Sequence, residues 1–259
     1  MDSEQVEIQA QRQAEEQNEE LEKRALVIMA HPDDAEFGSA GTIAKWVNEG
    51  WEVHYLVVTD ATGGGSDEAT DIGAEARELI ASTRKAEQRE AGRILGLAGI
   101  EFLDYPDGVI EPTLELRHAI VRVLRRLRPS RVICPSPDRS WDPVYSIGRH
   151  HADHLAVGAA SLAAIYPASQ NPWDFPELML EGLLPHKVRE VWVAGAPFNN
   201  HWVDISDTVD QKIDALRAHH SQLGAHFDRV EEMVRRWLTE TGDRHGVGAA
   251  EEFNLAKNG

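Results

Sequence analysis

Histidine and aspartate side chains stand in two short motifs whose spacing could bind a metal ion and activate water. One is His31-Pro32-Asp33-Asp34, directly behind an apolar run, and the other is His151-Ala152-Asp153-His154, about 120 residues later. A catalytic zinc ion commonly takes three histidine or carboxylate ligands and leaves one position open for water. Two histidines three residues apart at a helix start can project from the same side. We therefore predict a hydrolytic metal site whose ligands are His31, Asp34 and His154.

Three other residues of the two motifs could transfer protons or stabilise charge in a hydrolytic reaction. Asp33, next to a ligand, is the candidate to accept a proton from water, and His151 would stabilise an oxyanion or protonate a leaving amine. Asp153 would orient an imidazole or balance its charge. We predict that Asp33, His151 and Asp153 form the catalytic group.

Other interpretations of the same residues stay open. Asp33 and Asp34 would also suit the start of a helix, where carboxylates accept hydrogen bonds from free backbone amides. Two histidines and one carboxylate also describe the ligands of non-haem iron oxygenases, and such ligands accept Fe²⁺ as well as Zn²⁺. A third class is a noncatalytic sugar-binding or regulatory protein that retains the site. The conjunction of both motifs near the ends of predicted strands favours a metal site over a helix start. The α/β alternation and Asp33 argue against the oxygenase, and Asp33 with His151 argues against the noncatalytic protein.

Short apolar runs alternate with longer amphipathic stretches along most of the chain. This alternation predicts an α/β fold with a mostly parallel sheet, helices on both faces and the site at the carboxyl ends of the strands. The first strand-to-helix turn carries His31–Asp34 instead of glycines, which argues against a nucleotide cofactor. The predicted strands are 25–30, 52–59, 100–103, 131–134, 188–194 and 202–205, and the predicted helices are 36–49, 72–97, 114–127, 151–165, 207–223 and 226–240.

The composition limits the number of domains and the class of partner. The chain has 259 residues, enough for one sizeable core, and we predict a single catalytic domain over 25–259. Residues 1–24 hold eight acidic and three basic residues and are predicted to be an acidic extension. The whole chain carries 44 acidic against 26 basic residues, a net charge of −18, which argues against nucleic acid or an anionic membrane as partner. A small-molecule substrate fits this charge better.

The single cysteine and the first residues of the chain bear on its compartment. Cys134 lies in an apolar run, which predicts a buried thiol and excludes a disulfide framework within the chain. The acidic start lacks a basic region followed by an apolar core, and no apolar run approaches membrane-spanning length. We therefore expect a cytoplasmic protein, and self-association into a homo-oligomer stays open.

Two irregular stretches interrupt the alternation. Gly63–Ser66 is glycine-rich, and Tyr166–His186 contains four prolines. Both are expected to contact the part of a substrate beyond the reacting group, although the second would serve either as a lid or as a packed surface loop. Trp141 would either stack on a sugar face or pack against the protein.

The two motifs resemble those of the LmbE/PIG-L family of zinc-dependent N-acetylglucosaminyl deacetylases, whose members share a His-Pro-Asp-Asp motif and a later His-x-x-His. The segments Arg84–Leu97, Asp104–Gly108 and Lys212–Gln222 are also similar to signatures of this family. The resemblance extends over most of the chain and leaves out only residues 1–24. It implies a Rossmann-like fold with the site at the carboxyl ends of the strands.

The resemblance also implies a reaction, which is the removal of an acetyl group from an N-acetylglucosamine-type conjugate. It assigns zinc to His31, Asp34 and His154 and the role of base to Asp33, in agreement with the roles inferred above. By the same resemblance, His151 assists the tetrahedral intermediate with support from Asp153. Amide cleavage of a thiol conjugate or deacylation of a glycosylated natural product would use the same chemistry.

Residues that contact the substrate are implied by the resemblance alone. It places Arg84 and Asp107 near the sugar or its aglycone. For Arg84 the alternative is a surface ion pair, and for Asp107 it is a structural role in a Pro-Asp-Gly turn.

The chain departs from some relatives just ahead of the second motif. Those relatives carry Gly-Tyr-Gly there, whereas this chain has Arg149 where the tyrosine would stand, and Tyr145 is a candidate to substitute. His150 is predicted to be exposed or to lie behind a ligand rather than to be one. Near the end, His220 matches a family position of uncertain role, and His219 is predicted to lie on a helix surface.

Overall fold

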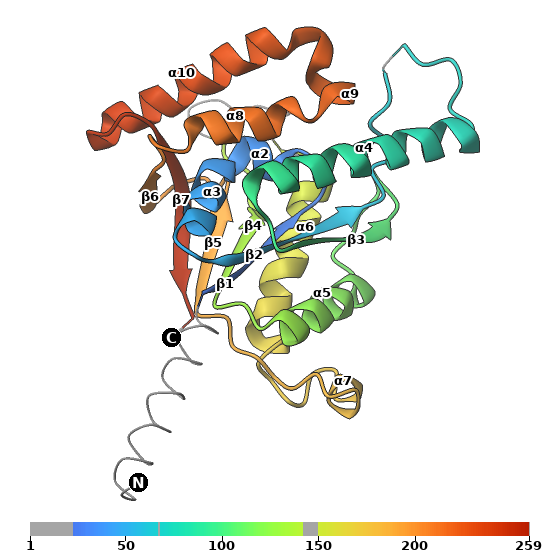
Figure 1. Cartoon of the computed structure of the whole chain (residues 1–259). Helices are drawn as coiled ribbons and strands as arrows, with labels where there is room; N and C mark the ends of the chain where they lie inside the picture. Colours follow the sequence, from blue (N-terminus) through green and yellow to red (C-terminus); the bar gives the residue numbers. More distant parts are fainter. Residues whose placement is uncertain (1–22, 67, 142–149, 259) are drawn as a thin grey trace, which may run out of the picture.

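The computed structural model describes residues 23–66, 68–141 and 150–258, and one seven-stranded sheet runs through them (Figure 1). Its strand order is β3-β2-β1-β4-β5-β7-β6. The first five strands in this order are parallel, whereas β7 runs antiparallel to both β5 and β6. The predicted mostly parallel sheet is therefore confirmed. The strands are β1 Arg24–Met29, β2 Glu52–Thr59, β3 Gly99–Tyr105, β4 Arg131–Pro135, β5 Glu190–Ala194, β6 His201–Asp204 and β7 Ala250–Lys257.

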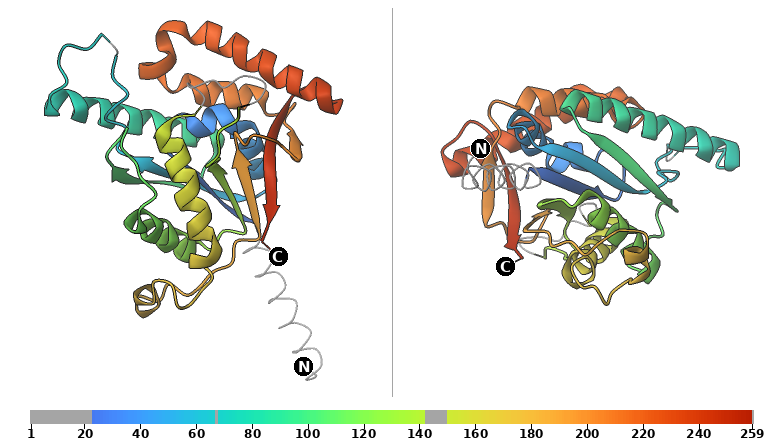
Figure 2. Two further views of the ribbon diagram at one scale, coloured as in Figure 1. Left: turned by 180° about the vertical axis from the view of Figure 1, so that it is seen from behind. Right: turned by 60° about the horizontal axis from the view of Figure 1, so that its bottom comes forward.

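Helices cover both faces of the sheet, as Figure 2 shows from two further directions. α5 and α6 pack on one face, and α3, α4 and α8 pack on the other, with α10 outside α8. No helix in the described part of the chain is long and apolar enough to cross a membrane. The helices are α2 Asp34–Gly38, α3 Ala40–Asn48, α4 Ala74–Leu95, α5 Leu114–Leu127, α6 Ala152–Ala163, α7 Glu177–Leu180, α8 Val209–Arg217, α9 His220–Leu223 and α10 Phe227–His245.

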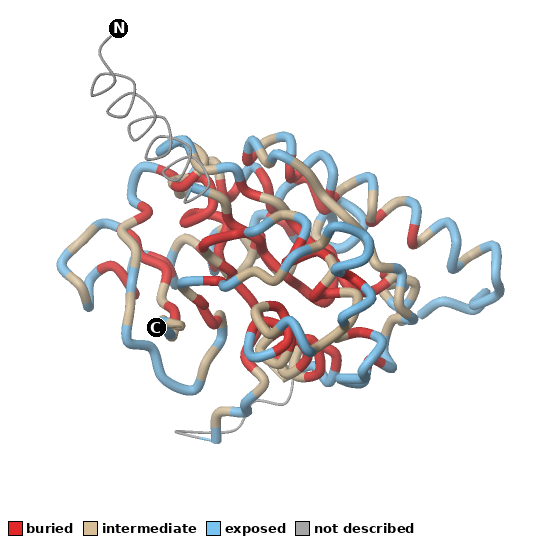
Figure 3. The backbone as a smooth tube through the Cα atoms, turned by 90° about the horizontal axis from the view of Figure 1, so that it is seen from below, coloured by how far each residue is buried: buried red, intermediate tan, exposed pale blue. Residues whose placement is uncertain are grey.

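The central strand β1 is apolar from Ala25 onward because this part of it is buried on both sides. Leu26 and Ile28 point into the core beneath α5 and α6, whereas Val27 and Met29 point into the core beneath α3 and α8. The tube in Figure 3 is red along this central layer. A strand covered on both faces has no polar alternation, and this explains the continuous apolar run that predicted it.

Three elements differ from the sequence-based prediction. The predicted helix 36–49 is two helices, α2 and α3, separated at Ser39, whose φ of −149° is not helical. The predicted helix 207–223 also ends early, at Arg217, and restarts as α9. Strand β7 was not predicted, because its Glu251 and Glu252 interrupt the apolar pattern. Glu251 is nevertheless buried, and its carboxylate is neutralised by contacts that only the tertiary structure provides.

The segment Tyr166–His186 lies at the amino ends of the strands, opposite the two motifs. α6 carries the chain back along the sheet, and the His186 ring contacts the carbonyl oxygen of Pro129, just before β4, at 2.7 Å. The interpretation of this segment as a packed surface loop is therefore confirmed. The expectation that it forms a lid or contacts substrate was wrong, because a helix that follows a parallel strand returns to the other end of the sheet.

Arg125 organises this segment from within. Its buried guanidinium donates hydrogen bonds to five backbone carbonyls between Ala168 and Phe175. We expect Arg125→Met to raise the rate of proteolysis within 168–175 by about tenfold or more, since local opening controls such cleavage. Turnover should stay within about twofold of wild type, because the segment is remote from the motifs. Arg126→Met is the control, because Arg126 is exposed on the same helix and pairs with Glu101 of β3 rather than with this segment. Equal protease resistance of both variants would contradict the prediction.

Cys134 lies on β4 and is fully buried, as predicted. Burial raises the pKa of its thiol to about 12, so almost none of it is thiolate at neutral pH. We expect no reaction of the native protein with a thiol reagent and one reacting thiol per chain after denaturation. Rapid labelling of the native protein would contradict this.

Candidate metal-dependent active site

The two motifs meet at the point where the strand order reverses. β1 and β4 are neighbours in the middle of the sheet, and the chain leaves them toward opposite faces, through α2 after β1 and through α6 after β4. The carboxyl ends of strands that diverge in this way are where α/β proteins bind ligands. His31 follows β1, and His151 and His154 stand at the start of α6.

Three side chains converge there with the spacing of a metal site. His31 Nδ1 lies 3.2 Å from His154 Nε2, and that nitrogen lies 3.0 Å from Asp34 Oδ1. The other Asp34 oxygen is 3.7 Å from His31 Nδ1. Ligands about 2.0–2.1 Å from a tetrahedral metal ion stand about 3.4 Å apart. The donor set and its spacing therefore fit a metal ion, and His31, Asp34 and His154 are the residues that would hold it.

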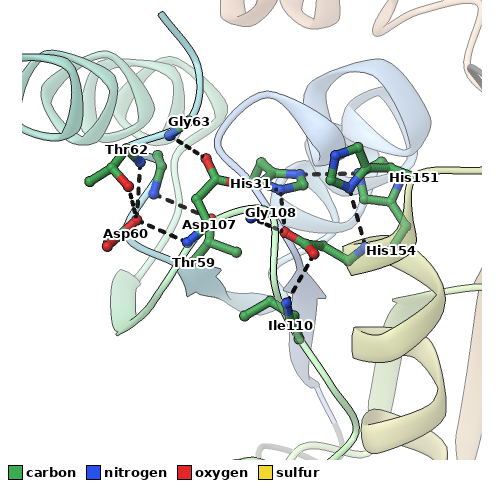
Figure 4. A network of polar contacts seen from close by, with 12 residues as sticks. His31, Thr59, Asp60, Thr62, Gly63, Asp107, Gly108, Ile110, His151 and His154 are labelled. Carbon is green, nitrogen blue, oxygen red and sulfur yellow. Dashed lines mark hydrogen bonds and ion pairs between the residues drawn. The ribbon is translucent and has the colours of Figure 1, made fainter. Parts of the chain in front are cut away.

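The orientation of His31 is set by two carboxylates on its far side (Figure 4). Its Nε2 lies 3.0 Å from Asp107 Oδ1 and 3.2 Å from Asp153 Oδ2. Asp153 also accepts hydrogen bonds from the backbone N–H groups of Gly108 and Ile110, at 2.7 and 3.1 Å. Because carboxylates accept, Nε2 carries a proton whether or not the ring is charged, and Nδ1 is the nitrogen that would bind a metal.

The same contacts govern the charges of this group. Burial alone would lower the pKa of His31, but hydrogen bonds to Asp107 and Asp153 and the charge of Asp34 raise it to about 10. Burial would raise the pKa of Asp153, yet His31 and the two backbone N–H groups lower it to about 2. Asp153 is therefore a permanent anion that stabilises positive charge on His31 or on a metal beyond it.

Asp33 has an unusual backbone conformation and an altered acidity. Its φ of 83° lies in the left-handed region, and its N–H donates to Gln88 Oε1 at 3.1 Å. Burial and the adjacent charge of Asp34 raise the pKa of Asp33 to about 7. A carboxyl group with a pKa close to neutral is suited to accept a proton in one step and release it in the next.

His151 caps α6 and faces the ring of His31. The N–H of Asp153 donates to His151 Nδ1 at 3.2 Å, so the neutral ring carries its proton on Nε2. The ring centroids of His151 and His31 lie 4.9 Å apart. His151 is exposed, which lets this Nε2–H reach a molecule bound beside His31.

Comparison with known proteins agrees with this geometry. The family model PIG-L, described as GlcNAc-PI de-N-acetylase, matches residues 26–165, a span that contains both motifs. The chain belongs to the PIG-L family. The matched span begins in β1 and ends just beyond α6. It therefore covers His31, Asp34 and His154, which we call the metal group.

Relatives in this family are named as deacetylases of amino-sugar compounds. The diacetylchitobiose deacetylase of Thermococcus kodakarensis is 34% identical over 200 residues, which cover 77% of this chain and 70% of that protein. The 1D-myo-inositol 2-acetamido-2-deoxy-alpha-D-glucopyranoside deacetylase of Rhodococcus erythropolis is 28% identical over 262 residues, covering 84% of this chain and 88% of its own. The structure of N,N'-diacetylchitobiose deacetylase from Pyrococcus horikoshii superposes with a TM-score of 0.80 at 30% identity, over 91% of this chain and 84% of that chain.

The residues that the PIG-L resemblance placed near substrate lie beside the metal group. Arg84 is buried, with only 6% of its surface exposed, so the alternative of a surface ion pair was wrong. Its Nη2 donates to the Pro32 carbonyl at 3.0 Å and lies 3.5 Å from Asp33 Oδ2. Asp107 contacts His31 and accepts a hydrogen bond from the Gly63 N–H at 2.9 Å. Both side chains contact residues of the first motif, and their contact with substrate stays a prediction.

The remaining residues named from the sequence lie outside the metal group or outside the described residues. His150 Nε2 accepts a hydrogen bond from the Ser140 N–H at 3.3 Å and is not one of the three grouped ligands. Trp141 is 71% exposed. Tyr145, Arg149 and the acidic start of the chain up to residue 22 lie outside the described residues.

His219 was wrongly predicted to lie on a helix surface. It precedes α9 and is completely buried, with Nε2 3.4 Å from Glu36 Oε2. Glu36 in turn contacts Gln88, which bonds to Asp33. The sequence analysis did not identify Glu36 or Gln88 as site residues. One signal was available, since Gln88 stands four residues after Arg84 and therefore on the same face of its helix.

Proposed function

We propose that this PIG-L family protein is a zinc-dependent N-deacetylase that releases acetate from an N-acetylglucosamine-type conjugate. The observation that supports this most directly is the trio His31, Asp34 and His154, whose ligand atoms are 3.0–3.7 Å apart, beside a carboxyl group whose pKa is about 7. The names of the relatives support the same class of substrate.

The roles of the side chains follow from their positions. A zinc ion at this trio would supply positive charge that polarises the acetamide carbonyl and acidifies a water molecule. Asp33 accepts the proton that water loses as its oxygen attacks the carbonyl carbon. His151 Nε2–H donates a hydrogen bond to the carbonyl oxygen as negative charge develops on it, and Asp33 then releases its proton to the amide nitrogen as the C–N bond breaks. The products are acetate and a free amine, and Asp153 holds His31 in place throughout.

The loop at Gly63–Ser66 is placed to contact the substrate beyond its acetamide group. It is held by the Gly63 bond to Asp107 and by Gln222 Nε2, which donates to the Gly64 carbonyl at 2.8 Å. A Cβ on Gly64 would lie 2.2 Å from Arg84 Nη1, so a side chain at this position would displace the Arg84 guanidinium. In this proposal Arg84 and Asp107 contact the sugar, and the loop contacts the aglycone, which distinguishes a disaccharide from a thiol conjugate or a glycosylated natural product.

Two further sequence-based predictions belong to this proposal. The described residues share one sheet, which supports a single catalytic domain over 25–259. The one cysteine is buried and unpaired, which supports a cytoplasmic location.

Acetate release with and without a chelator tests the function. The purified protein would be analysed for bound metal and incubated with N-acetylglucosamine, diacetylchitobiose and N-acetylglucosaminyl-inositol. We expect acetate release that a chelator abolishes and Zn²⁺ restores, with equal rates in air and under nitrogen. Dependence on dioxygen would favour the iron oxygenase, and bound metal without acetate release from any substrate would contradict the deacetylase. Reconstitution with Fe²⁺ compares the two metals.

A further inference from the structure

A buried chain of three side chains leads from the C-terminal part of the protein to the backbone of Asp33. His219 Nε2 lies 3.4 Å from Glu36 Oε2. The other Glu36 oxygen accepts a hydrogen bond of 2.9 Å from Gln88 Nε2. Gln88 Oε1 accepts the N–H of Asp33 at 3.1 Å. None of these three side chains forms a hydrogen bond or ion pair with His31, Asp34 or His154. All three are at most 1% exposed.

The backbone of Asp33 fixes the direction of these hydrogen bonds. Its N–H can only donate, so it requires the carbonyl oxygen of Gln88, and the NH₂ group of Gln88 then faces Glu36. Burial alone would lower the pKa of His219, but its contact with Glu36 and the charges of Asp33 and Glu87 raise this pKa above its ordinary value.

Asp33 needs such a restraint because its conformation is unfavourable. A residue other than glycine with a φ of 83° occupies a sparsely populated region. Such conformations persist where the surroundings impose them. Besides the bond to Gln88, the turn is held by Arg84, which donates to the Pro32 carbonyl.

We propose that Gln88, Glu36 and His219 are positioning residues that hold the Asp33 carboxylate at a fixed position beside the metal group. This inference rests on the proposed function, in which Asp33 is the base. Small misplacements of a catalytic group are costly, with losses of about 10²-fold for displacements near 1 Å. Without the chain, the backbone of Asp33 relaxes and its carboxylate leaves the place from which it reaches water.

The first test removes the link to Asp33 and leaves the volume nearly unchanged. Gln88→Leu should lower kcat by about tenfold or more, with KM and bound metal unchanged, since neither the ligands nor the substrate contacts are altered. Gln211→Leu is the matched control, because Gln211 donates one hydrogen bond to the carbonyl of Ile94, near the C-terminal end of α4. Wild-type kcat in Gln88→Leu would overturn the proposal. If this variant does not fold, Gln88→Met takes its place.

The second test exchanges the acceptor and the donor within the chain. Gln88→Glu alone sets two carboxylates face to face with no donor between them, and kcat should fall at least as far as in Gln88→Leu. The double variant Glu36→Gln with Gln88→Glu restores a donor at position 36 and keeps an acceptor for the Asp33 N–H. Its kcat should recover to within about fivefold of wild type. A double variant no more active than Gln88→Glu would overturn the proposal.

A readout independent of turnover separates this inference from the proposed function. Hydrogen exchange of the Asp33 amide, measured without substrate, should be about tenfold faster in Gln88→Leu than in wild type and unchanged in Gln211→Leu. If wild type releases no acetate from any substrate, the proposed function fails while the exchange rates still test the chain. If acetate is released and the Asp33 amide exchanges equally in all three proteins, the chain is wrong and the deacetylase stands.

Discussion

Asp33→Asn should lower kcat for acetate release by about 10²–10⁴-fold while the protein still binds its metal. Asparagine cannot accept the proton that water must lose. It does tolerate a left-handed backbone, so the φ of 83° and the bond to Gln88 should be kept. The three ligand atoms belong to other residues, and metal content should therefore match wild type. Turnover and metal content measured on the same preparation check both expectations.

Two matched variants make this result interpretable. Asp104 is also an aspartate with a positive φ, of 58°, but it pairs with Lys85 away from the metal group. Asp104→Asn should therefore keep full turnover. Asp34→Asn removes a ligand and should lose metal together with activity. Undiminished turnover in Asp33→Asn would contradict the assignment of Asp33 as the base.

Lys212→Met should destabilise the fold by roughly 3–5 kcal/mol, because it leaves a buried carboxylate without its cation. Lys212 is completely buried, and its Nζ lies 2.8 Å from Glu251 Oε1 and 2.7 Å from the Phe37 carbonyl. Glu251 also accepts the N–H groups of Gly41 and Thr42, at 3.0 and 2.7 Å, at the start of α3. The pair thereby joins α8 and β7 to the helices that follow the first motif. Chemical denaturation measures the loss.

The controls for this prediction differ in exposure and in charge. Arg93→Met removes a cation from the exposed pair with Glu90 and should leave the free energy of unfolding close to that of wild type, because water screens such pairs. Lys212→Met combined with Glu251→Gln should recover part of the loss, because the unpaired charge is gone. Equal stability of Lys212→Met and wild type would show that the buried pair does not hold these elements together.

The metal group could be predicted from the sequence because the residues of each motif are only a few positions apart. His31 and Asp34 share one loop, and His151 and His154 stand at one helix start, so spacing alone restricts where their side chains can point. Their convergence followed from a general property of parallel sheets, whose carboxyl ends meet at one edge. The partner of Asp153 could not be predicted in this way. Asp153 contacts His31, which lies 122 positions earlier in the chain, and only the packing of α6 beside β1 brings the two together.

The residues behind Asp33 were missed for a related reason. A buried charged side chain looks like a surface residue in a sequence, because burial depends on partners that are distant along the chain. Glu36, His219, Glu251 and Lys212 are all of this kind, and each is buried against an opposite charge from another element. The same effect concealed β7, whose buried glutamate broke the apolar pattern.

The sequence by itself determined the α/β class, the parallel centre of the sheet, the two motifs and the family to which they belong. These features rest on local patterns, such as apolar runs, helix periodicity and residues a few positions apart, and such patterns survive without knowledge of distant contacts. The tertiary structure alone decided which carboxylates orient His31, which polar chain reaches Asp33 and that Tyr166–His186 lies away from the site. Each of these depends on atoms brought together by the fold from separate elements, and their burial sets the charges and hydrogen-bond directions on which the proposed chemistry depends.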